Sequence, residues 1–599
     1  MNISDSIRKL TQLFIILFLA LSGGLVYWQV VVAQEVTANT HNVRHCLPDS
    51  APFRGRIYDR NGVLLAESKL TNNGCGYQRF YYLNNYPSLA GLIGYYISPF
   101  FSSTGIEHQF NDYLNGRVGL TSLNNTVNQT LHRPPLGDDI YLTIDVHMQS
   151  LLDKYFDQAP TPDNNLVFPT DRGSAIISNP HTGEILAMLS RPTFDPNCAV
   201  SCTLQQLKNL LGQRTDQLRQ LGYNLNGYDL NCQAPCSIDQ FKTALQKQNY
   251  DPNCENNGDC NLIYLDKLNK DPEQPLLERP IQDTYVPGST YKTVTLLAGV
   301  DSGKASLNDL FYNDHNPNHP QAIGPVTLGQ GNETETFGPV GNNIEGYTTK
   351  FPVNLNYGYT HSDNIIYAQT GVKVGAETWL DYNNRFYVGK QIPFDLPVTP
   401  STVLPKNGHL GVNLLGENAF GQGIDSITPL QMTMFDNGIA NNGKLMRPSL
   451  ILKIVDPNGA VIQSSNPQVL GTPISNTTAS QVRDAMYGVV QCGSGRFGFT
   501  SAPQYNPELF DSPYAIIAKT GTGQVGGNKG AESWLLTQAP YQNPQLTIVA
   551  MKENGGEGAL AIGPMVRHVY DDIFSNIMKI PTSQPAPQDY CQTTGLLQQ

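Results

Sequence analysis

Hydrophobic positions are concentrated near the N-terminus, over residues 13–32, where no charged residue occurs. A run of about 20 apolar residues is long enough to cross a hydrocarbon core of ~30 Å. Arg8 and Lys9 precede the run, and basic residues favour the cytoplasmic side. We therefore expect a single transmembrane helix at 10–33 behind a cytoplasmic tail at 1–9. A cleavable signal peptide is the alternative, which the length of the run and the missing small-residue cleavage pattern disfavour.

Beyond this segment the apolar positions take the period of two that is typical of strands. The pattern over 53–62 predicts a short strand that ends in an Asn-Gly turn, and 63–66 predicts its antiparallel partner. Residues 140–145 predict another strand, followed by a helix over 147–156 that Asp145 is placed to cap.

From residue 172 onward the pattern predicts a larger unit that combines strands with apolar helices. Residues 174–178 and 184–189 flank a His-Thr-Gly turn, which predicts a second hairpin. The segment thus combines strands and helices within one unit. The remaining elements are helices at 289–301, 364–375 and 425–440 and strands at 514–518, 534–537 and 546–552.

The composition is that of a globular protein outside the nucleic-acid-binding classes. The chain has 599 residues, enough for two or three domains, and its 54 glycines and 41 prolines indicate many turns. The formal net charge is −12, whereas a nucleic-acid partner would require basic stripes. The Pro- and Gln-rich end, 581–599, is expected to be a flexible tail.

Ten cysteines occur, and six of them lie in a Gly- and Asn-rich insertion at about 198–270. Clustered cysteines in a segment with little apolar core are typical of disulfides in an oxidising compartment, although the spacing does not decide how they pair. A zinc site is the alternative, because two pairs are each four residues apart, but no pair has CxxC spacing. The disulfide candidates are Cys198, Cys202, Cys232, Cys236, Cys254 and Cys260.

The first candidate catalytic feature is a serine and a lysine one helical turn apart, Ser289 and Lys292. The Pro-Gly pair at 287–288 turns the chain into the helix, so both side chains share a face near its positive end. That position favours a nucleophilic alkoxide and, through burial, an unprotonated lysine, while the Ser289 N–H can bind a developing oxyanion. The pattern alone is weak, because Ser6 and Lys9 repeat it.

A second feature, Lys519-Thr520-Gly521-Thr522, follows the strand predicted at 514–518. Its lysine would stabilise anions beside the nucleophile, and its two hydroxyls could hold a substrate carboxylate. Gly521 would let another backbone approach closely, and the Thr522 N–H would complete an oxyanion hole. A peptide substrate could lie along this strand edge as an added strand.

A third feature, Ser362-Asp363-Asn364, stands at the start of an apolar helix. Ser-x-Asn is a weak pattern, and Ser306 and Ser464 begin other copies. Ser306 lies too close to the end of the nucleophile's helix to fold back over it, and Ser464 lies on a predicted surface hairpin. The copy at the start of the apolar helix is therefore the best partner for the nucleophile.

At these motifs the sequence resembles the class B penicillin-binding proteins, membrane-anchored transpeptidases of bacterial cell-wall synthesis. Penicillin-binding proteins and class A β-lactamases share the set SxxK, SDN and KTG. The resemblance covers most of 10–580. It includes the segments 54–62, 105–107, 142–145, 182–187, 195–197, 285–292, 421–423 and 428–431.

The resemblance implies an elongated, non-catalytic, dimerisation-like pedestal at 34–170 and a serine β-lactamase-like transpeptidase domain at 171–580. The implied fold class is α/β (α+β), with an antiparallel sheet flanked by helices. The protein would sit in the cell membrane with a single span, a cytoplasmic N-terminus and an extracytoplasmic catalytic domain. Its expected partners are peptidoglycan stem peptides, β-lactams and the cytoplasmic membrane, with a glycosyltransferase of the division or elongation machinery as a candidate. Neither a cofactor nor a metal is expected. The insertion at 198–270 departs from the family pattern.

The resemblance also assigns roles to residues. It makes Ser289 the acylated nucleophile and Lys292 its general base, with the N–H groups of Ser289 and Thr522 as the oxyanion hole. Ser362 would relay a proton to the leaving amine, and Asn364 would contact the substrate amide. Lys519 completes the catalytic set. The expected substrate-binding residues are Thr520, Gly521, Thr522 and Asp363.

The resulting hypothesis is a D,D-transpeptidase that crosslinks stem peptides through a serine acyl-enzyme. A D,D-carboxypeptidase would use the same residues with water as acceptor, and a scaffolding or β-lactam-sensing membrane protein is a further alternative. A β-lactamase would need neither an anchor nor a pedestal. The histidines, including His361 beside Ser362, show no ligand spacing and are interpreted as structural.

Overall fold

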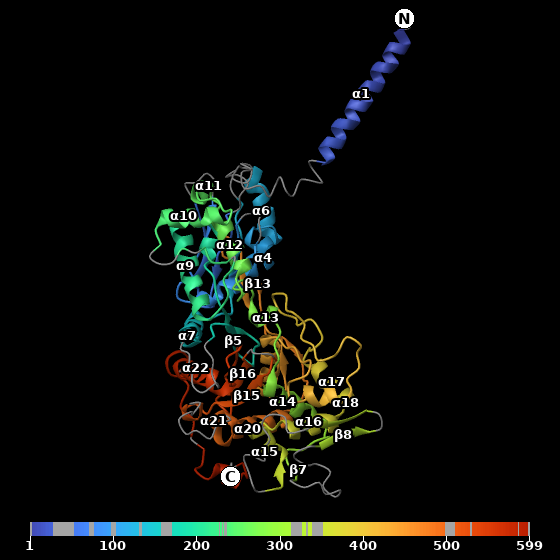
Figure 1. The fold of residues 1–599 in the computed structure, drawn as a ribbon, viewed down its shortest axis with the longest axis vertical. Helices are drawn as coiled ribbons and strands as arrows, with labels where there is room; N and C mark the ends of the chain where they lie inside the picture. Colours follow the sequence, from blue (N-terminus) through green and yellow to red (C-terminus); the bar gives the residue numbers. More distant parts are fainter. Residues whose placement is uncertain are drawn as a thin grey trace.

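The computed structural model of the 599-residue chain comprises an N-terminal helix, a pedestal, an insertion and a large domain (Figure 1). The pedestal and the insertion lie at one end of the molecule, and the large domain lies at the other. The structure describes residues 3–27, 53–70, 77–97, 103–130, 135–156, 170–226, 228–230, 232, 236–312, 326–330, 333–337, 351–497, 509–526, 530–584 and 586–596.

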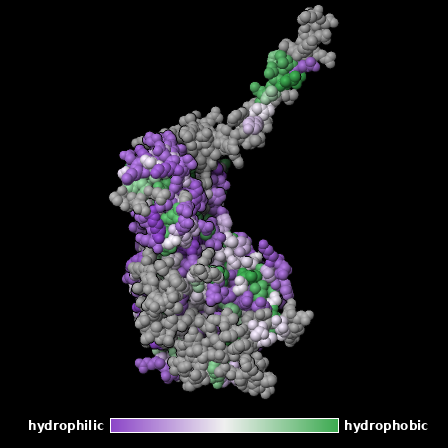
Figure 2. Space-filling view, viewed as in Figure 1, coloured by the Kyte–Doolittle hydropathy of each residue, from purple (hydrophilic) through white to green (hydrophobic). Residues whose placement is uncertain are grey.

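The N-terminal helix α1 spans Ile3–Val26, so the structure describes the predicted anchor at 10–33 only in part. Figure 2 shows an apolar band on this helix. Within the described residues, no helix combines the length and the apolar character that crossing a membrane requires. The exposed large apolar residues of α1 are Leu13, Phe14, Ile15, Ile16, Leu17, Phe18 and Leu21.

The pedestal is built around a six-stranded sheet of order β13-β12-β4-β1-β2-β3. The first predicted hairpin is confirmed as β1 and β2, and β4 leads into α7 as predicted. Asp145 caps α7, because its carboxylate accepts a hydrogen bond of 2.9 Å from the His147 N–H. The strands are β1 (Ile57–Tyr58), β2 (Leu64–Leu70), β3 (Tyr77–Tyr81), β4 (Asp139–Leu142), β12 (Ile451–Val455) and β13 (Val461–Ser464).

Two strands of this sheet come from the C-terminal half of the chain. The surface hairpin predicted at Ser464 is confirmed as β12 and β13, and β12 pairs with β4, with Ile454 opposite Ile140. The pedestal is therefore not made from residues 34–170 alone. Its helical segments are η3 (Pro87–Leu89), α3 (Ala90–Ile93), α4 (Gly105–Gln109), α5 (Asn111–Leu114) and α6 (Gly119–Thr130). The helix that follows β4, α7 (Val146–Phe156), packs instead against β6 and α22 of the large domain.

A five-stranded antiparallel sheet of order β15-β16-β17-β5-β6 forms the centre of the large domain. The second predicted hairpin is confirmed as β5 and β6. Every residue of β16 and β17 is buried, because α7 and α22 cover one face while α19 and α20 cover the other. The strands are β5 (Gly173–Ser178), β6 (Ile185–Arg191), β15 (Ile517–Gly523), β16 (Glu532–Ala539) and β17 (Leu546–Lys552).

Polar caps fix where the helices of the large domain begin. The side chains of Asp363, Thr428 and Ser475 cap α16, α19 and α20. The helical segments are α13 (Arg279–Gln282), η4 (Gly288–Tyr291), α14 (Lys292–Asp301), α15 (Leu355–Thr360), α16 (Asn364–Val374), α17 (Ala376–Arg385), α18 (Val412–Asn418), α19 (Pro429–Ala440), α20 (Asn476–Cys492), α21 (Ser494–Phe497), η6 (Leu509–Asp511), α22 (Gly558–Asp572), the π-helix η7 (Ile573–Ile577) and α23 (Tyr590–Thr593). Small two-stranded sheets pair β7 (Leu310–Phe311) with β10 (Val353–Asn354), β8 (Val326–Gln330) with β9 (Glu333–Phe337), and β11 (Leu445–Met446) with β14 (Val469–Gly471).

The cysteine-rich insertion is a helical unit that packs against the pedestal. The Asn197 side chain bonds the backbone N–H and C=O of Tyr81 on β3, at 2.9 Å each. The predicted disulfides are confirmed, and each joins cysteines close in sequence, which excludes them as zinc ligands. The pairs are Cys198–Cys202, Cys232–Cys236 and Cys254–Cys260. The helices are α8 (Pro196–Val200), α9 (Leu204–Gln220), α10 (Ile238–Lys247), α11 (Cys254–Asn257) and α12 (Cys260–Lys270).

The C-terminal segment differs from the flexible tail expected at 581–599. It contains α23 and is joined to the end of α20 by the disulfide Cys492–Cys591. Leu596 is buried, with 1% of its surface exposed. A Pro- and Gln-rich composition predicts little core, but a disulfide and one buried leucine suffice to dock the segment. Cys46 and Cys75 lie outside the described residues.

Candidate active site

Ser289 lies on a tight turn that leads into α14. The turn is the 3-10 helix η4, and Gly288 has a left-handed φ of +55°. A Cβ at Gly288 would lie 2.5 Å from the carbonyl carbon of Thr522, so only glycine lets the turn contact β15. Ser289 is half-buried, whereas Lys292 is fully buried. The hydroxyl is therefore accessible and the amine is not.

The amine of Lys292 lies at the centre of the site. Its Nζ is 2.8 Å from Ser289 Oγ, 2.6 Å from the Ser362 carbonyl oxygen and 2.7 Å from Asn364 Oδ1. Burial lowers the pKa of Lys292 to about 7, while the nearby Asp363 carboxylate acts in the opposite direction. The sequence-based expectation of a lysine with a lowered pKa beside the serine agrees with this geometry.

The loop before α16 carries the second serine into the site. Ser362 is buried and has φ of +64°, a backbone region that residues other than glycine rarely occupy. Its hydroxyl lies 3.2 Å from Lys292 Nζ and 2.9 Å from Lys519 Nζ. Two amines therefore share one hydroxyl, an arrangement that the sequence did not predict.

Lys519 reaches this hydroxyl from β15. The motif was predicted to follow a strand at 514–518, but β15 spans Ile517–Gly523 and contains the whole motif. Pairing with β16 continues through Thr522, opposite Ser533, which sequence periodicity did not reveal. Burial, followed by the nearby charge of Lys292, lowers the pKa of Lys519.

The rest of the motif lines the approach to Ser289. A Cβ at Gly521 would lie 2.8 Å from Thr290 Cγ2 and 2.9 Å from the Pro287 carbonyl oxygen, so the expected close approach is observed. The Thr522 hydroxyl is buried, and none of the residues that the structure describes hydrogen-bonds to it. Its capacity to hydrogen-bond is therefore unused by the described part of the chain.

Two nearby residues were not found from the sequence. The Ser494 hydroxyl lies 2.8 Å from Thr520 Oγ1, and the Gln422 amide lies 3.4 Å from the Thr522 carbonyl oxygen. Ser494 belongs to no motif, so no sequence signal pointed to it. Gly421-Gln422-Gly423 was noted only as part of the family resemblance.

Asp363 was expected among the substrate-binding residues, but its carboxylate is turned inward. It is fully buried and accepts a hydrogen bond of 2.7 Å from the Ile366 N–H, which caps α16. We therefore assign it a positioning role. Across the part of the chain that the structure describes, no three His, Cys, Asp or Glu side chains are arranged to hold a metal ion.

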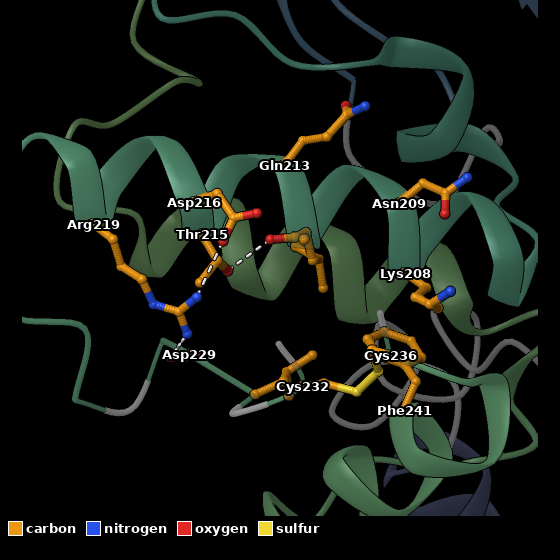
Figure 3. A pocket seen from close by; sticks show the side chains of 13 residues that line it. Lys208, Asn209, Gln213, Thr215, Asp216, Arg219, Asp229, Cys232, Cys236 and Phe241 are labelled. Carbon is orange, nitrogen blue, oxygen red and sulfur yellow. Dashed lines mark hydrogen bonds and ion pairs between the residues drawn. A yellow bond between two sulfur atoms is a disulfide. The ribbon is translucent and has the colours of Figure 1, made fainter. Parts of the chain in front are cut away.

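A cavity of about 320 Å³ lies in the insertion, away from α14. Figure 3 shows Arg219 directed toward Asp216 and Asp229. The Cys232–Cys236 disulfide lines another side of the cavity. Arg219 pairs there with both carboxylates, and the described lining residues include no serine that could act as a nucleophile.

A half-buried serine beside a buried lysine, at the edge of an antiparallel sheet covered by helices, defines a serine acyltransferase of the penicillin-recognising class. Residues 240–579 match the family described as the penicillin binding protein transpeptidase domain, and residues 54–140 match the penicillin binding protein A dimerisation domain. The chain therefore belongs to the penicillin-binding protein transpeptidases.

The curated relatives include peptidoglycan D,D-transpeptidases. The chain is 27% identical over 569 residues to PbpA of Mycolicibacterium smegmatis, covering 94% of this chain and 96% of that one. It is 24% identical over 516 residues to MrdA of Escherichia coli, covering 80% and 66%.

Solved structures share the fold. Penicillin-binding protein A of Mycobacterium tuberculosis, as a ceftriaxone acyl-enzyme complex, has a TM-score of 0.66 at 23% identity, covering 88% of this chain and 99% of that one. Penicillin-binding protein 3 of the same organism has a TM-score of 0.61 at 20% identity, covering 90% and 98%.

Proposed function

We propose that this protein is a D,D-transpeptidase that joins peptidoglycan stem peptides through a serine acyl-enzyme and is acylated by β-lactams. One observation carries the proposal: Lys292 Nζ lies 2.8 Å from Ser289 Oγ, while carbonyl oxygens of Ser362 and Asn364 lie 2.6 and 2.7 Å away. A neutral amine gives both N–H bonds to those oxygens, so its lone pair faces the Ser289 hydroxyl. That is the arrangement a general base requires.

In the acylation step, Ser289 Oγ attacks the carbonyl of a D-Ala–D-Ala bond while its proton passes to Lys292. The developing oxyanion accepts hydrogen bonds from the N–H groups of Ser289 and Thr522. When the amide bond breaks, the proton reaches the leaving amine through Ser362, which lies between Lys292 and Lys519. D-Ala departs, and an ester remains on Ser289.

In the second step, the amine of a neighbouring stem peptide attacks this ester. Lys292 removes a proton from that amine and returns one to Ser289 Oγ as the ester bond breaks. The products are a new amide crosslink and the free enzyme. With water as acceptor the same groups would perform the carboxypeptidase reaction.

Substrate binding is assigned to β15 and the loop before α16. The terminal carboxylate would accept hydrogen bonds from the hydroxyls of Thr520 and Thr522, near the amine of Lys519. The backbone at Gly521 borders the nucleophile turn, which leaves room for a peptide along the strand edge. Asn364 would contact the substrate amide through its side-chain nitrogen, since its oxygen faces Lys292.

The N-terminal segment is proposed to anchor the enzyme in the cytoplasmic membrane by a single span at 10–33, with the large domain outside the cytoplasm. The exposed apolar side chains of α1 support this proposal, because such a surface is unfavourable in water. Disulfides fit an extracytoplasmic location. A glycosyltransferase of the division or elongation machinery remains the proposed partner.

Acylation by a fluorescent penicillin tests the nucleophile. We expect Ser289→Ala to form no adduct by intact-protein mass spectrometry. Ser6→Ala, which alters the other Ser-x-x-Lys pattern, is the matched control and should retain the adduct. An adduct on Ser289→Ala at another site would refute the assignment. Supplying lipid-linked precursor then separates the two reactions, because only transpeptidation gives crosslinked dimers.

A further inference from the structure

The docked C-terminal segment, residues 589–596, contacts the large domain at three places. The disulfide Cys492–Cys591 joins it to the end of α20, and the Tyr590 ring lies 5.1 Å from the Tyr487 ring. Leu596 packs on α20 where Gly488 leaves room, since a Cβ there would lie 2.9 Å from Leu596 Cδ1. The segment is therefore held at both of its ends.

The last of these contacts reaches the loop that carries Ser362. The Leu596 carbonyl oxygen lies 3.1 Å from His361 Nε2 in a buried position. A carbonyl can only accept, so Nε2 carries the proton and donates. Burial lowers the pKa of His361 to about 4, which keeps the ring neutral near pH 7. His361 directly precedes Ser362 in the chain.

The disulfide also fixes the end of α20, whose following residues contact both the loop before α16 and β15. Cys492 is followed by Gly493, where a Cβ would lie 2.0 Å from the Thr360 carbonyl oxygen. The next residue, Ser494, has its hydroxyl 2.8 Å from Thr520 Oγ1. The disulfide-linked C-terminal segment thus supports both the loop before α16 and the Lys519–Thr522 motif on β15.

We propose that residues 589–596 form a positioning element of the catalytic site, which holds Ser362 through His361 and Thr520 through Ser494. Ser362 occupies a rarely populated backbone region, and such a conformation persists only where the surroundings fix it. The inference rests on the roles proposed above for Ser289, Lys292 and Ser362.

Loosening this element has a defined effect on Lys292. Two of its hydrogen-bond acceptors belong to Ser362, so a displaced loop admits water beside the amine. Burial is what lowers the pKa of Lys292, and hydration would raise it toward 10.5. The other titratable groups facing Lys292 are Asp363 at the α16 cap, Lys519 on β15 and Tyr367 on α16.

The test compares two double variants of the full chain, Cys492→Ser/Cys591→Ser and, as matched control, Cys232→Ser/Cys236→Ser in the insertion. Stopped-flow labelling with a fluorescent penicillin separates the binding constant from the acylation rate constant at each pH. We expect the first variant to lose about tenfold or more in acylation rate at pH 7, with a higher pH midpoint. The control should keep both wild-type values.

If loss of the disulfide prevents folding, substitution of Leu596 loosens the same segment and leaves the disulfide in place. Leu596→Gly should reduce the acylation rate and raise its pH midpoint, and Leu596→Met should restore both. Wild-type rates and midpoints in the folded disulfide and Leu596→Gly variants would overturn the inference. Acylation of Ser289→Ala would instead overturn the proposed catalytic roles, so the two failures are distinguishable.

Discussion

Two buried lysines share the Ser362 hydroxyl, with Lys292 Nζ at 3.2 Å and Lys519 Nζ at 2.9 Å. Two adjacent positive charges out of contact with water are unfavourable, so at least one amine is held neutral. Burial lowers the pKa of both amines. The proposed mechanism requires the neutral one to be Lys292, because its Nζ lies 2.8 Å from Ser289 Oγ, whose proton it must accept. Lys519 then provides the charge that attracts a substrate carboxylate.

The acylation rate should depend on pH through Lys292. Its pKa is lowered to about 7, and only the unprotonated amine accepts the Ser289 proton. The rate should therefore fall about tenfold per pH unit below 7 and level off above it. Stopped-flow acylation between pH 5 and 9 measures this. Lys292→Arg should abolish acylation at every pH, because guanidinium does not deprotonate; a retained rate would exclude Lys292 as the base.

The Thr522 hydroxyl offers a substitution that leaves the fold intact. Thr522→Val keeps the shape of the side chain and removes a group that bonds to none of the described residues. We expect no loss of thermal stability and about a tenfold loss in second-order acylation rate, because one substrate hydrogen bond to a charged group disappears. Thr243→Val on the exposed face of α10 is the control. An unchanged acylation rate would remove Thr522 from the binding site.

At the scale of elements, the turn that carries Ser289 packs against two glycines, Gly421 in the loop after α18 and Gly521 on β15. The backbone of Gly421 packs directly against η4, and its carbonyl oxygen accepts a hydrogen bond of 2.9 Å from the Gly288 N–H. A Cβ at Gly421 would lie 1.8 Å from the Gly288 carbonyl oxygen. Backbone packing, more than side-chain bonding, sets the position of Ser289.

Gly421→Ala should therefore displace the nucleophile turn. Gly421 has φ of +85° and Gly459, in the β12–β13 turn, has φ of +89°, but a Cβ at Gly459 meets no atom within 4 Å. Gly459→Ala is the matched control for backbone strain, which costs about 1–3 kcal/mol. We expect both variants to lose stability by thermal melting and only Gly421→Ala to lose acylation. Equal acylation in the two variants would contradict this account.

The sequence allowed prediction of the elements that local chemistry determines. Turn residues marked both hairpins, and motif spacing brought Ser289, Ser362 and Lys519 into one hypothesis. Local patterns could not give the extent of β15, because the glycine and threonines of its motif are poor strand signals. Ser494 and the contact of Leu596 with His361 depend on segments distant in sequence, and the docked end was predicted as flexible from composition alone.

At the scale of the whole molecule, an ionic network centred on Arg214 links the insertion to residues that flank it in the chain. Arg214 on α9 pairs with Asp271 at 2.7 Å, Glu273 at 2.7 Å and Asp171 at 2.9 Å. The network holds the insertion near β5, whereas α14, which follows Ser289, lies further into the large domain (Figure 1). A change in the structure of the insertion should therefore leave the acylation of Ser289 unchanged.

Arg214→Ala should loosen the insertion without changing acylation. Removing the guanidinium leaves the buried Asp271 carboxylate without that partner, a change worth about 3–5 kcal/mol. Limited proteolysis should cut within 198–270 faster than in the wild type. Arg219→Ala, which breaks a more exposed pair, should cost about 0–1 kcal/mol and serve as control. A matching loss of acylation in Arg214→Ala would show that the insertion supports the site.

The hairpin β12–β13 has a consequence for how the chain assembles. Until residues 451–464 have been synthesised, β4 remains an open edge, and such edges invite pairing with other chains. The sheet of the pedestal therefore closes only after most of the large domain has been synthesised. Assembly is then a late, long-range event, a topology that slows folding and lengthens exposure to aggregation or to chaperones.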